Sequence, residues 1–277
     1  MKIDQIIDEA LKEDIGDGDH TSDACIPEAA QGKAKLLVKE NGVIAGVELA
    51  QRIFTRFDQT LKVEILIADG VEVNAGDVVL TVEGSSRSIL KTERLVLNFM
   101  QRMSGIATKT HHLNKLISGT SAKLLDTRKT TPLLRELEKL AVKIGGGVNH
   151  RFGLYDMVMI KDNHIDMAGG IEQAISRVKS HLEKIGKDLK IEIEVRDFDE
   201  LNQALSVGGF HRIMLDNFLP DDEAKAVELI GGRYETEASG GITEETIRAH
   251  ALAGVDYISV GALTHNIKSL DLSLKAV

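Results

Sequence analysis

Short apolar runs alternate with amphipathic helical stretches from about residue 122 to the end of the chain. The apolar runs have the length of buried strands, and the stretches between them repeat apolar residues at helical spacing. Strands that alternate with helices favour parallel pairing with right-handed crossovers, in a doubly wound sheet or a barrel. Strands are predicted at 122–126, 157–161, 190–195, 212–216, 233–239 and 256–261. Helices are predicted at 132–143, 168–186, 198–206, 221–230 and 243–253.

The first 110 residues or so have a different pattern, in which β-rich stretches follow an amphipathic opening helix. The β-rich stretches cover 32–46 and 61–84, and a turn at 74–77 in the second one predicts a hairpin. A helical segment over 88–117 then leads into the alternating part, and we expect an interruption at Gly105. The pattern therefore indicates two parts of different architecture.

The composition is that of a globular protein, with 43% hydrophobic and 28% charged residues among 277. No apolar run approaches the roughly 20 residues that a membrane span needs. The opening helix is acidic and lacks the apolar stretch of a secretory signal. Cys25 is the single cysteine, which excludes an intrachain disulfide and fits a reducing compartment. We therefore expect a cytoplasmic protein with no membrane partner.

With a net charge of −9, the overall electrostatic field of the protein disfavours binding to nucleic acid or to anionic membranes. The charge is nevertheless uneven along the chain. Between Lys123 and Lys161, eight basic residues stand against four acidic ones. This excess predicts a local anion site, although a solvated helix face explains 135–143 equally well.

Polar residues follow nearly every predicted strand. A single polar strand end is usually a helix cap, but in an α/β barrel the carboxyl ends of all strands surround one active site. Six polar ends in succession therefore predict a shared site. These ends are Asp126-Thr127-Arg128-Lys129, Lys161-Asp162-Asn163-His164, Glu192 with Glu194, Asp216-Asn217, Ser239-Gly240-Gly241 and Gly261.

Two of the strand ends, SGGIT (239–243) and VGALT (260–264), indicate a phosphate site. Glycines let backbone N–H groups approach an anion, and a following helix adds the positive end of its dipole. The loops after the last barrel strands are a common phosphate site of this fold. Neither a P-loop nor a G-x-G-x-x-G motif occurs, which disfavours ATP and dinucleotides.

Charged side chains at the other strand ends suggest the rest of the chemistry. Glu194 and Asp216 are candidate ligands of magnesium or acceptors for ribose hydroxyls. His150, Arg151 and Lys161 suit a di-acid, because guanidinium groups pair with carboxylates in a bidentate way. Two alternatives stay open for individual residues. Lys161 is also a candidate Schiff-base lysine, and Glu192 a salt-bridge partner of a neighbouring strand's lysine.

Several longer motifs resemble one family, the quinolinate phosphoribosyltransferases, or decarboxylating nicotinate-nucleotide pyrophosphorylases. They occur in the family's order and cover almost the whole chain. One departure is Leu133, where the family often has glycine. The motifs are LLDTRKTTP, GGGVNHRFGLYDMVMIKDNH, EIEV, IMLDN, EASGGI and VDYISVGALTH, preceded by EDIGDGDHTSD and ERLVLNFMQRMSGIAT.

The resemblance implies an α/β fold with an N-terminal α/β sandwich domain over 1–110, joined by the tail 266–277, and an incomplete, open α/β barrel of six parallel strands over 111–265. The implied reaction transfers phosphoribosyl from phosphoribosyl pyrophosphate to quinolinate with decarboxylation. It yields nicotinate mononucleotide, pyrophosphate and CO2 for NAD biosynthesis, and it requires Mg²⁺.

The resemblance also assigns roles to residues of this chain. The carboxylates of quinolinate fall to Arg94, Arg128, His150, Arg151 and Lys161. The phosphoribosyl pyrophosphate contacts fall to Thr127, Lys129, Ser239, Gly240, Gly241, Gly261, Ala262 and His265. Glu194 and Asp216 take the ribose and magnesium positions, the metal being held directly or through water. The expected catalytic residues are Lys129, Lys161, Glu194 and Asp216.

The resemblance further implies a homodimer with shared active sites, in which Arg94 reaches the neighbouring subunit's barrel; a hexamer is the open alternative. Rival interpretations are a transferase of the same fold acting on another small acid, a phosphosugar aldolase using Lys161, and a catalytically inactive phospholigand-binding protein.

Overall fold

The structure is a computed structural model that describes residues 3–277, and the chain forms two compact units. The first unit contains Met1–His111, Thr130–Gly146 and Ala262–Val277. The second contains His112–Lys129 and Gly147–Gly261. The expected barrel, 111–265, includes the stretches 130–146 and 262–265. In the structure these two stretches belong to the first unit. Within the described residues, no helix has the length and apolar character needed to cross a membrane.

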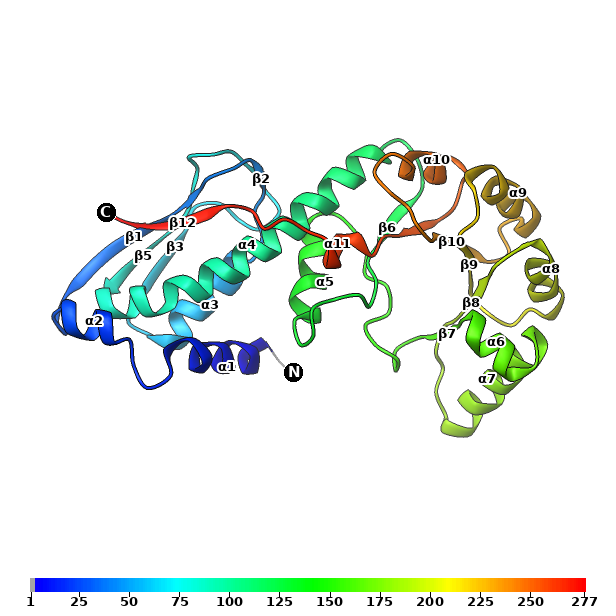
Figure 1. Ribbon diagram of the computed structural model, residues 1–277, viewed down its shortest axis with the longest axis horizontal. Coiled ribbons are helices and arrows are strands. Elements are labelled where there is room, and N and C mark those ends of the chain that lie inside the picture. Colours follow the sequence, from blue (N-terminus) through cyan, green and yellow to red (C-terminus); the bar gives the residue numbers. More distant parts are fainter. Residues whose placement is uncertain (1–2) are drawn as a thin grey trace. The chain divides into compact units, whose positions relative to one another are not determined.

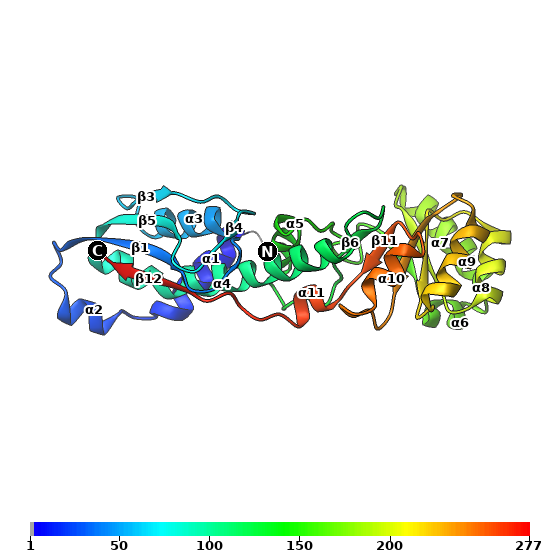
Figure 2. The ribbon, with the colours of Figure 1, turned by 90° about the horizontal axis from the view of Figure 1, so that it is seen from above.

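An antiparallel sheet organises the first unit, in the order β12 (Leu272–Ala276), β1 (Gln31–Val38), β5 (Val78–Ser85), β3 (Lys62–Ile65). Along β1, buried positions alternate with more exposed ones, as expected for a sheet with one covered face. The C-terminal strand β12 pairs antiparallel with β1, and both views show the two strands side by side (Figures 1 and 2). The end of the chain thus completes the sheet that its beginning starts.

Amphipathic helices accompany this sheet. The apolar faces bury Ile7 of α1 and both Ile53 and Phe54 of α3. The longest helix, α4, continues past His111 into the residues of the second unit. The helices are α1 (Ile3–Ile15), α2 (His20–Cys25), α3 (Val47–Phe57), α4 (Ser86–Leu116), α5 (Arg135–Ile144) and α11 (Ala262–His265).

Two expectations for this part of the chain were wrong. The helix α4 is not interrupted at Gly105. A Cβ there would lie 2.3 Å from the carbonyl oxygen of Lys268, so the glycine permits a close backbone approach. The turn at 74–77 does form, but the strands beside it do not make a hairpin. Instead, β4 (Glu72–Val73) pairs with β2 (Gly42–Val43), while β5 pairs with β1 and β3.

In the second unit six parallel strands form one sheet within the described residues, and all six lie where the sequence predicts them. The order along the sheet is β6 (Lys123–Leu125), β11 (Tyr257–Ser259), β10 (Glu235–Ser239), β9 (Arg212–Asp216), β8 (Ile191–Val195), β7 (Val158–Ile160). The strands β6 and β7 are its two edges, so the barrel is open, as expected.

Helices connect consecutive strands and lie on the outer side of this sheet (Figure 1). Their glycine ends are left-handed C-caps, as at Gly186 and Gly231. A short helix directly after β7 was not predicted; it begins at the polar strand end itself. The helices are α6 (Asp162–Ala168), α7 (Ile171–Ile185), α8 (Phe198–Val207), α9 (Pro220–Ile230) and α10 (Ile247–Leu252).

Candidate active site

The carboxyl ends of the six strands carry the predicted polar residues of the second unit. Because neighbouring strands are parallel, their ends lie on the same edge of the sheet. Asp216 and Ser239, for example, are direct partners in the register of β9 and β10. We call this edge the mouth; it holds Thr127, Arg128, Lys129, Lys161, Glu194, Asp216, Ser239, Gly240, Gly241 and Gly261.

An ion pair links two neighbouring strand ends. Lys161 Nζ donates to Glu194 Oε2 over 2.5 Å. The side chain of Glu194 is buried, whereas that of Lys161 is 43% exposed. The pKa of Asp216 on the next strand is raised by burial and by the negative charge of Glu194, while Lys161 opposes the shift. Glu194 and Asp216 therefore lie close enough to repel each other.

This carboxylate pair fits a magnesium ion. Both side chains offer hard oxygen ligands at adjacent strand ends, and magnesium is commonly bound through one or two carboxylates plus substrate phosphates. A divalent cation would also relieve the repulsion that raises the pKa of Asp216.

Two guanidinium groups lie near each other at the mouth. The pKa of Arg151 is lowered by burial and by the positive charge of Arg128, against the attraction of Glu192 and Asp156. Arg151 Nη1 also donates to the carbonyl oxygen of Met157, 3.4 Å away. A pair of like charges at a partly buried site favours the binding of an anion, beside the nearby Glu192 and Asp156. This arrangement suits a ligand with carboxylate groups.

Backbone geometry dictates the glycine after β10. Gly240 has φ 101°, and a Cβ there would lie 2.2 Å from Asn217 Oδ1. The backbone N–H of Asn217 donates to the carbonyl oxygen of Ser239 over 2.8 Å, which fixes the two loops to each other. The following helix α10 begins at Ile247 and not near Thr243 as expected. The dipole contribution to a phosphate at Gly241 is therefore smaller than the sequence suggested.

His150 lies below the mouth in a buried ion cluster. Its Nε2 lies 3.1 Å from Glu192 Oε2 and 3.3 Å from Glu237 Oε2. The Glu237 carboxylate in turn accepts a hydrogen bond from Arg212 over 3.0 Å. Burial acts to lower the pKa of His150, but the two carboxylates outweigh it and raise this pKa to about 9. Burial and the nearby Glu237 raise the pKa of Glu192 to about 7.

Glu237 and Arg212 were not predicted as site residues, and the candidate partner of Glu192 was a lysine. Arg212 begins the mainly apolar strand β9, and Glu237 is in the buried centre of β10. Charged residues inside such strands are the signal that would have revealed them, because a fully buried charge needs a partner.

Three predicted site residues belong to the first unit. Arg94 lies on α4, and Ala262 and His265 lie on α11, which follows Gly261 directly. Arg94 is exposed and has no hydrogen-bond or ion-pair partner among the described residues. A pairing with the adjacent Glu93, the structural alternative to a role at the site, is thus not formed.

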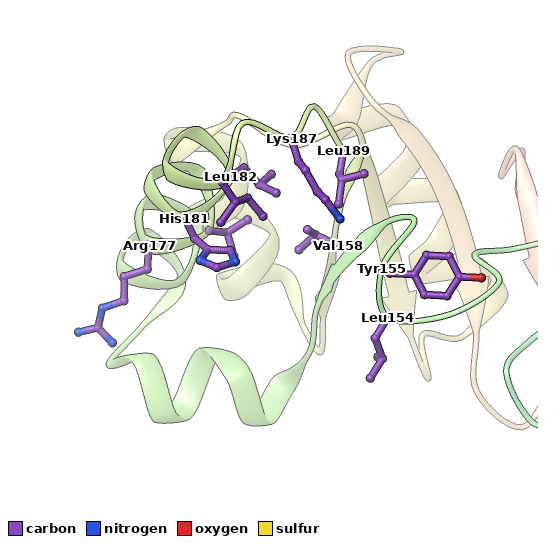
Figure 3. Close-up of a pocket in the computed structure, with 10 residues that line it drawn as sticks. Leu154, Tyr155, Val158, Arg177, His181, Leu182, Lys187 and Leu189 are labelled. Atoms are coloured by element: carbon purple, nitrogen blue, oxygen red, sulfur yellow. The ribbon is translucent and has the colours of Figure 1, made fainter.

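A cavity of about 360 Å³ lies elsewhere in the second unit (Figure 3). Its wall is mainly apolar and comes from α7, the end of the loop before β7, and the segment before β8. Val158, Leu182 and Leu189 are among its lining residues, and no predicted site residue is. The predicted chemistry is therefore concentrated at the mouth.

Comparison with known proteins shows the family to which the chain belongs. The family model "Quinolinate phosphoribosyl transferase, N-terminal domain" matches residues 19–104, and the corresponding C-terminal domain matches residues 106–275. The chain belongs to this family. The two matches together leave only the ends of the chain and a single residue between them outside.

Similar members come from plants and bacteria. The "Quinolinate phosphoribosyltransferase [decarboxylating] 1" of Nicotiana glauca is 47% identical over 98% of this chain and 81% of its own. The "Probable nicotinate-nucleotide pyrophosphorylase [carboxylating]" of Bacillus subtilis is 40% identical over 99% and 93%. A crystal structure of NadC from Streptococcus pyogenes superimposes with a TM-score of 0.94, at 40% identity over 99% and 97%. The open barrel with its antiparallel first unit is thus the family's fold.

Proposed function

We propose that this enzyme transfers the phosphoribosyl group of phosphoribosyl pyrophosphate to quinolinate. The ring then loses CO2, and the products are nicotinate mononucleotide, pyrophosphate and CO2, in a step of NAD biosynthesis. The observation that carries the proposal is the pair of mutually repelling guanidinium groups, Arg128 and Arg151, at the mouth of a family barrel. Quinolinate, with two adjacent carboxylates, is an anion that this pair can bind.

Quinolinate binds against the cationic side of the mouth. Arg128 and Arg151 pair with its carboxylates, and Lys161 adds a third positive charge beside Glu194. His150 stands between these cations and the buried carboxylates. The ring nitrogen of quinolinate is thereby directed toward the ribose, because the carboxylates fix the orientation of the planar ring.

Phosphoribosyl pyrophosphate binds along the glycine-containing ends of β10 and β11. Backbone N–H groups at Ser239, Gly240 and Gly241, and at Gly261 and Ala262, are the donors for its phosphates. Thr127, Lys129 and His265 complete the phosphate contacts. Lys129 also acts catalytically, by neutralising charge that grows on the leaving pyrophosphate.

The transfer breaks the bond from ribose C1 to the pyrophosphate oxygen, whose electron pair leaves with the pyrophosphate, and it forms a bond from the ring nitrogen to C1. Positive charge develops on the ribose, and Glu194 and Asp216 stabilise it electrostatically. These two carboxylates would also hold Mg²⁺, directly or through water. When bound, that ion neutralises charge on the pyrophosphate. Lys161 holds Glu194 in place.

Decarboxylation follows on the product ring. The bond from C2 to the carboxylate breaks, and its electron pair stays on C2, next to the ring nitrogen that has become cationic. A proton then takes the place of CO2. The enzyme contributes position more than covalent chemistry, since the cationic ring itself stabilises the electron pair.

We further propose a cytoplasmic homodimer in which the partner's Arg94 completes each site. The alternative is a hexamer built from three such dimers. The exposed side chain of Arg94, which has no partner among residues 3–277, supports this assembly. Arg94 would add a further positive charge to the cluster that receives quinolinate.

The test is release of labelled CO2 from carboxyl-labelled quinolinate, measured with and without phosphoribosyl pyrophosphate and Mg²⁺. We expect release that depends on both, and pyrophosphate in equal amount. Pyrophosphate release with nicotinate or another small acid, but none with quinolinate, would favour the same-fold rival. Borohydride trapping of a phosphosugar on Lys161 would favour the aldolase, which the family match already disfavours.

A further inference from the structure

A buried ion network underlies the mouth and joins three strands. It consists of Glu192 on β8, Arg212 on β9 and Glu237 on β10, together with His150. Glu192 and Glu237 are fully buried. Charges without access to water are costly unless partners satisfy them, so a network of this kind is rarely present without a purpose in the fold or the site.

His150 is the point at which this network reaches the mouth. Its backbone N–H donates to Asp126 Oδ1 over 2.8 Å, at the end of β6. Its Nδ1 lies 2.6 Å from the backbone nitrogen of Arg151. Its Nε2 faces the two carboxylates. The ring therefore spans the distance between the buried carboxylates and the backbone of the arginine at the mouth.

Arg212, at the end of the network farthest from His150, has several contacts of its own. Arg212 donates to Glu237 and, through Nε and Nη2, to Glu235. Its guanidinium lies 4.1 Å from the ring centre of Tyr257, a cation–π contact. Glu237 is thus fixed from below by Arg212 and presents its carboxylate to His150 above.

The location of His150 gives this arrangement a function. It lies in the connection to β7, and β6 and β7 are the unpaired edges of the open sheet. A single bridge between Leu125 and Val148 attaches the connection to β6. With so little strand pairing to position this connection, side-chain contacts must fix the loop that carries Arg151.

We propose that Glu237 and Arg212 are positioning residues: through His150 they fix the backbone of Arg151, and so the guanidinium that receives the acid substrate. Glu192, the second carboxylate on His150, completes the cradle. The proposal rests on the proposed function, because it names the acid-binding arginine as the group that is positioned. It assigns Glu237 and Arg212 no contact with substrate.

The test is a double-mutant cycle with Glu237→Gln and His150→Asn, with the Michaelis constants for both substrates measured in each variant. We expect Glu237→Gln to raise KM for quinolinate by roughly tenfold and to change KM for phosphoribosyl pyrophosphate less than twofold. In the His150→Asn background the same change should have no further effect on KM for quinolinate. Arg212→Lys, which keeps the positive charge, serves as a second variant if Glu237→Gln does not fold.

The matched control is Glu223→Gln. Glu223 and His250 form another buried carboxylate–histidine pair, at 2.9 Å between α9 and α10, away from the mouth. Its loss should lower the melting temperature without changing either KM. If Glu223→Gln raised KM for quinolinate as much as Glu237→Gln, a general loss of stability would explain both effects, and the positioning role would be refuted. Additive effects in the cycle would refute it as well.

A structural readout separates this proposal from the proposed function. The ring ¹⁵N shifts of His150, in histidine-labelled protein without substrates, should change in Glu237→Gln and Arg212→Lys but not in Glu223→Gln. If wild-type protein released no CO2 from quinolinate, the proposed function would fail while this result still judged the network. His150, Glu192 and Glu237 also have the spacing of metal ligands. One equivalent of tightly bound metal, lost in Glu237→Gln, would replace the network by a metal site and overturn the proposal.

Discussion

Lys161 Nζ lies 2.5 Å from Glu194 Oε2, across the ends of β7 and β8. Burial and the negative charge of Glu194 raise the pKa of Asp216, and the positive charge of Lys161 opposes this shift. The side-chain amide of Asn217 also donates to Asp216 Oδ2. Lys161 thus serves both substrates in the proposed reaction. It brings positive charge toward the acid, and it holds the carboxylate that stabilises the ribose cation.

From this geometry we expect Glu194→Gln and Asp216→Asn to lower kcat far more than they weaken quinolinate binding. Groups that stabilise transition-state charge are worth roughly 10²–10³ in kcat when removed. Steady-state kinetics and equilibrium binding of quinolinate check this. Asp222→Asn, which breaks an exposed pair with Lys225 on α9, is the control and should leave kcat unchanged. Normal kcat with weak quinolinate binding would instead place the carboxylates at the acid.

The repulsion between Arg128 and Arg151 predicts that either alanine variant chiefly loses affinity for quinolinate. Removing one partner of a buried charged contact costs about 2–5 kcal/mol, or roughly thirty- to several-thousand-fold in binding. Calorimetric titration with quinolinate measures the loss directly. Arg233→Ala, an exposed arginine before β10 that bonds only to backbone carbonyls of α9 among the described residues, should bind quinolinate normally. Near-normal affinity in Arg128→Ala or Arg151→Ala would exclude that residue as a carboxylate partner.

Gly240→Ala should impair use of phosphoribosyl pyrophosphate. The alanine would have to adopt a φ of 101°. Its Cβ would lie 2.2 Å from Asn217 Oδ1 and 2.9 Å from the Asn217 backbone nitrogen, so the loop must move. We expect KM for phosphoribosyl pyrophosphate to rise roughly five- to 150-fold, by analogy with the ~1–3 kcal/mol that overpacking costs. Gly232→Ala carries comparable strain at φ 72° with nothing within 4 Å, and it should cost stability alone. Equal kinetics in the two variants would contradict the assignment of this loop to the phosphates.

Stability should fall as the pH rises from about 7 to 9. The folded pKa of His150 is raised to about 9 and that of Glu192 to about 7, so the folded cluster holds a proton that the unfolded chain has released. The stabilisation is complete below the unfolded pKa values and is lost as the pH passes through the folded ones. Each extra proton corresponds to about 1.4 kcal/mol per pH unit.

Urea unfolding at pH 6.5 and 9, followed by circular dichroism, measures this dependence. His150→Asn should be less stable than wild type at pH 6.5 and should have a flatter pH dependence. A wild type that is equally stable at both values would show that the cluster binds no additional proton.

The strand pattern was sufficient to predict the six parallel strands of the second unit, but it left open whether they form a doubly wound sheet or a barrel. The composition of the first unit was less informative. The turn at 74–77 forms, yet β4 pairs with β2 and β5 lies between β1 and β3, a choice made by tertiary packing that local pattern does not reveal. At Leu133 the resemblance implies a glycine. The structure gives Leu133 a φ of 68°, a left-handed conformation that glycine adopts more easily than leucine.

The site was predictable where residues lie at strand ends and unpredictable where they lie beneath. Lys161, Glu194 and Asp216 follow directly from strand positions, and the structure brings them together. Glu237 and Arg212 pair only because β9 and β10 are neighbours in the sheet, which sequence order alone does not determine. A contact between side chains on two strands can be predicted only when the register of the strands is known, and the register depends on the fold.

The final prediction is that Arg94→Ala and Arg128→Ala complement each other. Arg94 is exposed on α4 and has no partner in the described part of its own chain, so we expect it to act in the barrel of the partner subunit. The two variants, each nearly inactive, are unfolded together and reassembled, and CO2 release is measured. After random mixing, half of the dimers are mixed, and each has one intact site of two, so roughly a quarter of all sites should recover. If Arg94 acts within its own chain, every site in a mixed dimer lacks one arginine, and activity stays at the level of the variants. Mass measurement confirms that mixed dimers are present, which makes an absence of recovery decisive against the shared site.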